Sequence, residues 1–185
     1  NTQGFENENH DITSKITYDV NVTGGEGLNE RKAYYDELLR LQKDYIGKKE
    51  QMDIEAAKQQ TDYDLEDSER QYQDQLRSLD DFYNRQKDLM DKNLEQGLMS
   101  QEEYNTEMAT LTQQHADQEA KLQENANAQQ IAIVKRGENE VTRIMNEAND
   151  ERVEANNEYL RQMTDSLGRY YDEIGSKMRS TTKRN

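Results

Sequence analysis

The chain contains no proline, no cysteine and no tryptophan, and only 9 of its 185 residues are glycine. Proline breaks helices because it has no backbone N–H and its ring clashes with the preceding turn, so this chain has few obligatory helix breaks. The absence of cysteine excludes disulfides and zinc sites made of thiolates. The longest apolar run, 131–134, is far shorter than the roughly 20 residues of a membrane span.

Apolar residues are also scarce, at 31% of the chain, whereas 34% of the residues are charged and the mean hydropathy is −1.33. Such a chain cannot assemble a thick core, so it is either disordered or buries a thin seam between helices. We favour the seam because leucine, isoleucine, methionine and the 11 tyrosines recur at helical spacings. The net charge of −15 opposes binding to nucleic acid or to an anionic membrane surface.

The first 27 residues predict an extended arm. Between 12 and 22, Ile16, Tyr18, Val20 and Val22 alternate with polar residues, which indicates a short strand. The glycines of segment 24–27 then predict a turn; this segment has no Walker lysine, so we do not interpret it as a phosphate site. Because the chain opens on Asn1 without a methionine, we expect a fragment or a processed product.

Two long helices follow in the prediction. The first covers 28–97, with apolar residues at alternating spacings of four and three. The second covers 100–178, is weakened near Gly137, and is followed by a basic tail at 179–185. Between them, Gly97 suits the position after a helix end, and Ser100 with Glu103 forms a capping box. A short connection favours antiparallel helices, so we predict a hairpin with its tip at 97–100; one kinked rod is the alternative.

The sequence therefore predicts an all-α fold: an elongated, coiled-coil-like helical hairpin with a short N-terminal strand or extended arm. Tyrosine can bury its ring while its hydroxyl remains in contact with water, which suits thin interfaces between helices. The residues predicted to form the helix interface are Tyr34, Leu38, Leu41, Tyr45, Leu76, Leu79, Tyr83, Met108, Leu111, Leu122, Tyr159, Met163, Leu167 and Tyr170.

Residues that carry out chemistry are few. The two histidines, His10 and His115, lie far apart in sequence, and no cysteine assists them, so we expect no metal site and no cofactor. We interpret His115 as an interface residue, with a pH-sensitive contact as its functional alternative. The acidic segment 62–67 lacks the glycine of a calcium-binding loop, and we interpret it as a solvated helix face. We expect no enzyme activity, because no convergent reactive set is visible.

Part of the chain resembles a known family. The sequence Leu79-Asp80-Asp81-Phe82-Tyr83 is followed by 94–104, in which leucine, an acid, glycine and a hydrophobe precede Ser100-Gln101-Glu102-Glu103-Tyr104. This pattern, over about a quarter of the chain, resembles the helical hairpins of bacteriophage tail tape measure proteins. The resemblance implies a mostly helical protein that occupies the tail tube and sets its length; it implies no catalytic residues.

The function expected from these observations is structural. The chain would be a helical rod that associates with copies of itself or with other helical chains, including tail-tube or particle proteins, in a virion. The alternative is a coiled-coil adaptor or assembly scaffold, cytoplasmic if not phage-derived, that binds basic proteins through its acidic surface. Contact with nucleic acid is expected only through the basic tail, and no contact with a membrane is expected.

Overall fold

The computed structural model describes residues 27–183, which form two helices. Helix α2 covers Leu28–Glu95 and helix α3 covers Gln101–Thr182. The predicted all-α helical hairpin is confirmed: the helices pack against each other, and there is no strand within 27–183. The predicted strand at 12–22, most of the arm at 1–27, and His10 lie outside the described residues.

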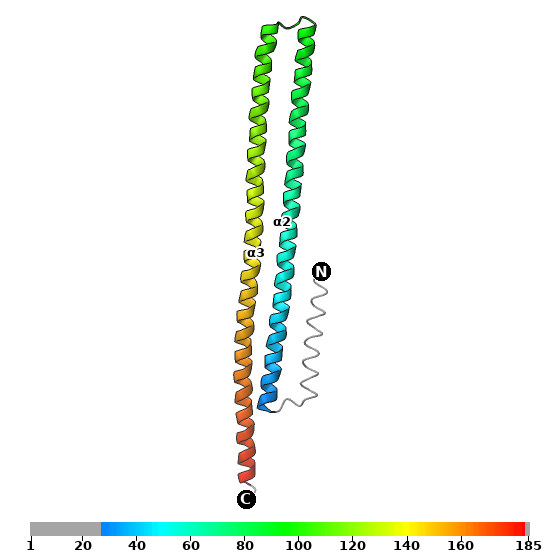
Figure 1. Ribbon diagram of the computed structural model, residues 1–185. Helices are drawn as coiled ribbons and strands as arrows, with labels where there is room; N and C mark the ends of the chain where they lie inside the picture. Colours follow the sequence, from blue (N-terminus) through cyan, green and yellow to red (C-terminus); the bar gives the residue numbers. More distant parts are fainter. Residues whose placement is uncertain (1–26, 184–185) are drawn as a thin grey trace. The chain divides into compact units, whose positions relative to one another are not determined.

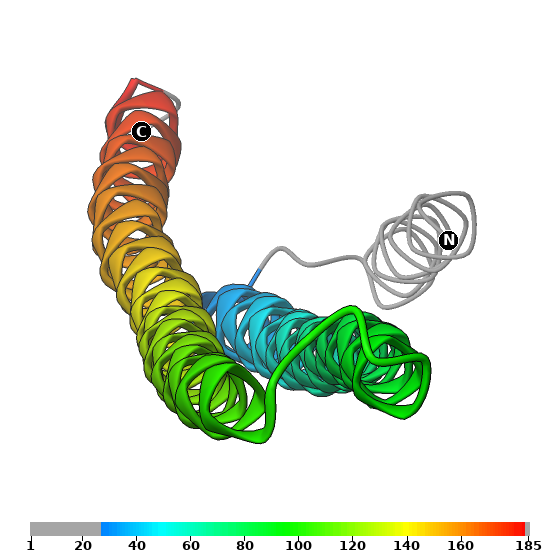
Figure 2. The same ribbon diagram turned by 90° about the horizontal axis from the view of Figure 1, so that it is seen from above.

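The chain divides into two compact units. Over the described residues, the terminal unit combines 27–54 with 142–183, and the turn unit is Glu55–Val141. In each unit a segment of α2 lies beside a segment of α3 (Figures 1 and 2). The partners run in opposite directions: in the turn unit Glu69 contacts Gln130 and Tyr83 contacts Thr112, and in the terminal unit Arg31 contacts Glu173.

The turn between the helices is built by local chemistry. Gly97 has a φ of 73°, which is favourable only without a side chain, and it is the one positive φ in the described part of the chain. Its N–H donates to the carbonyl of Leu94 at 3.1 Å, and the N–H of Leu98 donates to that of Asn93 at 2.9 Å. These two bonds form a Schellman motif, which satisfies carbonyls at the end of α2.

The start of α3 is capped reciprocally. The N–H of Glu103 donates to Ser100 Oγ at 3.1 Å, and the N–H of Ser100 donates to Glu103 Oε2 at 3.0 Å. This is the capping box that the sequence indicates. Together with the Schellman motif, it separates α2 from α3 within five residues.

Helix ends differ slightly from the predicted ones. Helix α2 stops at Glu95, because Gly97 already adopts the turn conformation. Helix α3 continues to Thr182, into the predicted basic tail, where the hydroxyls of Ser180 and Thr181 donate to the carbonyl of Lys177 at 2.8 and 2.9 Å. These bonds add two side-chain donors to a carbonyl near the end of the helix.

Gly137 does not interrupt α3. A Cβ atom at this position would lie 2.2 Å from Thr61 Oγ1 and 3.2 Å from Thr61 Cβ, so α2 and α3 approach closely there. Relief of this clash would require the β-branched Thr61 to move and give up the bond that its hydroxyl donates to the carbonyl of Ala57 at 3.0 Å. The glycine is explained by this close approach, and the helix runs through it unbroken.

Candidate interaction surfaces

The buried seam between the helices is thin. Within 27–183 no side chain is less than 2% exposed. The most buried positions are mostly small or β-branched: Ser68, Ile133, Ala148, Ile46, Ile144, Ser166, Ala126 and Met90. Small side chains let the helix backbones come close but remove little apolar surface from water.

The structure places the predicted interface residues beside this seam. All of them are half-buried, and none is fully buried. That list of interface residues omits the eight most buried positions, although the helical spacing of apolar residues in the sequence includes Met90, Ala126 and Ala148. Small residues at spacings of 7 and 11, which return to the same helix face, are the signal that the sequence offers for the others, as in Ala148, Ala155 and Ser166.

Charged groups join the helices of the terminal unit. Arg31 Nη2 lies 3.1 Å from Glu173 Oε2, and Arg31 Nη1 donates to the carbonyl of Ser166 at 3.3 Å. Arg152 Nη2 lies 2.6 Å from Glu50 Oε2, at an angle that does not make a hydrogen bond. Both arginine side chains are one-third exposed or less, so these pairs are shielded from water better than the exposed pairs along a single helix.

A tyrosine adds to the contacts of the terminal unit. The hydroxyl of Tyr159 on α3 donates to Asp36 on α2, which also accepts from Lys32 at 2.8 Å. The Lys32 bond, and then the Tyr159 bond, hold the pKa of Asp36 below its usual range. The same carboxylate raises the pKa of Tyr159, because it favours the protonated phenol as donor.

Hydrogen bonds join the helices of the turn unit instead. His115 Nε2 lies 2.8 Å from Asp80 Oδ1, and its ring lies 4.6 Å from the ring of Tyr83. The hydroxyl of Tyr104 donates to Asp91 at 2.6 Å, and the amide of Gln130 donates to Glu69 at 3.2 Å. His115 therefore belongs to the helix interface, as its position in the sequence indicated.

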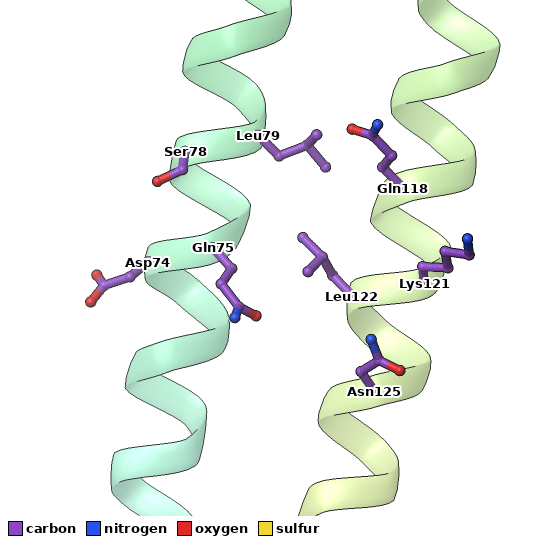
Figure 3. Close-up of a pocket in the computed structure, with 8 residues that line it drawn as sticks. All are labelled: Asp74, Gln75, Ser78, Leu79, Gln118, Lys121, Leu122 and Asn125. Atoms are coloured by element: carbon purple, nitrogen blue, oxygen red, sulfur yellow. The ribbon is translucent and has the colours of Figure 1, made fainter.

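The turn unit also contains a shallow groove between α2 and α3, of about 550 Å³. Leu79 and Leu122 point toward one another across its floor, and Gln118 extends above them (Figure 3). The other lining residues are polar: Asp74, Gln75, Ser78, Lys121 and Asn125. Its two charged lining residues, Asp74 on α2 and Lys121 on α3, point away from each other (Figure 3).

Residues 27–183 contain neither a candidate metal site nor a candidate membrane span. No group of three histidine, aspartate or glutamate side chains in this range could hold a metal ion. None of the helices in this range combines the length and the apolarity needed to cross a bilayer.

Charge is distributed unevenly between the two units. Residues 55–141 contain 20 acidic and 9 basic residues, which gives the turn unit a net charge of −11. The described part of the terminal unit contains 14 acidic and 13 basic residues, for a net charge of −1. The acidity of the chain is therefore concentrated in the turn unit.

Several large apolar side chains are exposed. On α3 of the terminal unit, Val153, Leu160, Tyr171 and Met178 are 58%, 60%, 64% and 66% exposed. Their spacings of 7, 11 and 7 residues keep them on one face of the helix. We call these four residues the α3 stripe.

Comparison with known proteins gives no relative: no protein-family model, curated protein or solved structure matches the chain.

Proposed function

We propose that the chain is a structural assembly protein, a helical hairpin that associates with further helices to complete its core. The observation that carries this proposal is the combination of a thin seam with exposed apolar residues on the outer faces. Two helices with no fully buried side chain gain little free energy from burial, while ordering each residue costs about 1–2 kcal/mol of conformational entropy. Additional helices would supply the missing burial.

The finer form of the proposal places the hairpin in a phage tail or a comparable particle, as part of a tape-measure-like, length-setting or lumen-filling protein. Its support is the resemblance of segments 79–83 and 94–104 to the hairpins of that family. The capping box of Ser100 and Glu103 lies within the resembling segment. The charged outer faces would suit a protein that fills a lumen.

A second function is favoured by the charge distribution. With a net charge of −11, the turn unit could bind basic proteins as the surface of an adaptor or scaffold. Such binding would be electrostatic, so it would weaken steeply with salt.

Circular dichroism and light scattering of the isolated chain test the first function. We expect a strongly helical species with a mass above the 21.7 kDa of one chain, or a chain of low helicity that becomes helical when helical partners are added. A fully helical monomer that unfolds cooperatively would contradict the proposal, because it would need no further helices. Helicity gained only with polylysine, and lost in salt, would favour the adaptor.

A further inference from the structure

The α3 stripe lies on a face of α3 that α2 does not cover. Buried Ala148 and Ser166 mark the side of α3 that packs against α2. Val153 and Tyr171 each follow one of these residues by five positions, which is about 140° around a helix. Helix α3 also continues past the first turn of α2 (Figure 1). Nothing within 27–183 therefore packs over this stripe.

Between Leu160 and Met178 the same face carries a regular coiled-coil pattern. Its positions follow spacings of 4, 3, 4, 3 and 4 residues, as in the core of a heptad repeat. We call this second, outward-facing set of positions the seam 160–178, and it consists of Leu160, Thr164, Leu167, Tyr171, Ile174 and Met178. All are exposed or half-buried, and five of the six are apolar or aromatic.

From this pattern we infer that the seam 160–178 binds the same seam of a second copy of the chain, with the two α3 helices antiparallel. The inference rests on the proposed association with other helices and names the surface and the partner. In this register the residue numbers of facing core positions sum to 338, whereas the flanking positions pair with sums of 336 on one side of the core and 340 on the other. Leu160 then faces Met178 of the second copy, Thr164 faces Ile174, and Leu167 faces Tyr171, so each layer pairs residues that fill complementary volumes.

The glycine next to the middle of the seam fits this arrangement. A Cβ at Gly168 would meet no atom within 4 Å, so nothing in the described hairpin requires glycine there. Glycine inside a helix nevertheless lowers its stability relative to alanine. In the antiparallel register Gly168 of one copy lies opposite Gly168 of the other, where the absence of side chains permits a close approach of the two helices.

Charge also favours a second copy at this place. The residues that flank the seam are Arg161, Met163, Gly168, Tyr170, Gly175 and Lys177, without an acid. In the antiparallel register Arg161 faces Gly175 and Lys177 faces Met163, so no like charges oppose each other. The terminal unit is almost neutral, whereas the turn unit, at −11, would repel a second copy of itself.

The absence of cysteine makes the register directly testable. The full chain would be prepared as Leu160→Cys and as Met178→Cys, and each variant would be oxidised alone and as an equimolar mixture. In the antiparallel seam a disulfide can form only between the two variants, because identical positions lie on the order of 27 Å apart. Leu98→Cys, at a leucine in the turn that is 73% exposed, replaces either variant as the control.

We expect the wild-type chain to have a mass twice 21.7 kDa, and cross-linked dimer to form only in the mixture. Dimer in each variant alone would overturn the antiparallel direction. If the wild-type chain forms a larger species but no cross-link appears in either variant alone or in the mixture, the seam 160–178 is not the binding surface. The proposed association with other helices would still hold. A wild-type mass of 21.7 kDa with low helicity would contradict binding to a second copy but not the proposed association with other helices. A fully helical, cooperatively unfolding monomer would contradict both.

Discussion

The terminal and turn units use the same two helices but hold them together differently. In the terminal unit arginines reach across to acids, as in Arg31 with Glu173 and Arg152 with Glu50, and the unit is almost neutral. In the turn unit the helices meet closely at Gly137 and Thr61, and hydrogen bonds such as His115 with Asp80 cross the seam. An acidic segment can thus pack as a hairpin when small residues, and not ion pairs, set the distance between its helices.

The largest expected effect is that of filling the close approach in the turn unit. Gly137→Ala places a Cβ 2.2 Å from Thr61 Oγ1, so Thr61 must move and lose its bond to the carbonyl of Ala57. Overpacking costs about 1–3 kcal/mol and exceeds the gain of about 1 kcal/mol from removing a helical glycine. We expect a net loss of up to about 2 kcal/mol in the free energy of unfolding, measured by urea denaturation.

Two further variants sharpen this test. Gly47→Ala lies in the terminal unit, where the nearest atom to the new Cβ is Arg152 Nη2 at 4.0 Å, and it should stabilise the protein by up to about 1 kcal/mol. In the double variant Thr61→Ala with Gly137→Ala, only the Cβ contact at 3.2 Å remains, and most of the loss should be recovered. Equal effects of Gly137→Ala and Gly47→Ala would contradict the close approach.

The next effect tests the ion pairs of the terminal unit. Glu50→Gln removes the charge that faces Arg152 while it keeps the shape of the side chain, and Glu50 is largely shielded from water. We expect a loss of about 1–2 kcal/mol, by the same urea measurement, because Arg152 would remain partly buried without its partner. The loss should shrink in 1 M salt.

Glu147→Gln is the matched control for the loss of negative charge in Glu50→Gln. Glu147 pairs with Arg143 along one helix, with both side chains more than half exposed. Such pairs contribute about 0.3–0.5 kcal/mol, so the control should change the free energy of unfolding by no more than that. If both glutamate variants have the same effect, the contact between Glu50 and Arg152 does not hold the helices together.

The sequence predicts those parts of the fold whose chemistry is local. Gly97, Ser100 and Glu103 define the turn because each interacts with residues at most four positions away. The sequence predicts a weak point at Gly137 because glycine lowers helix stability. It does not reveal the contact of Gly137 with Thr61, which lies 76 positions earlier in the sequence. Contacts between helices require the register of one helix on the other, which a narrow seam with charged residues on all faces does not specify.

The smallest effect concerns the cost of a small polar residue in the seam of the turn unit. Ser68 is 3% exposed, and its hydroxyl has no hydrogen-bond partner. Ser68→Ala removes this unsatisfied group and adds helix propensity, so we expect the free energy of unfolding to rise by about 0.5–1 kcal/mol. Thermal unfolding followed by circular dichroism measures this. A lower melting temperature would mean that the hydroxyl is paired in solution and contributes to the turn unit as the arginines do to the terminal unit.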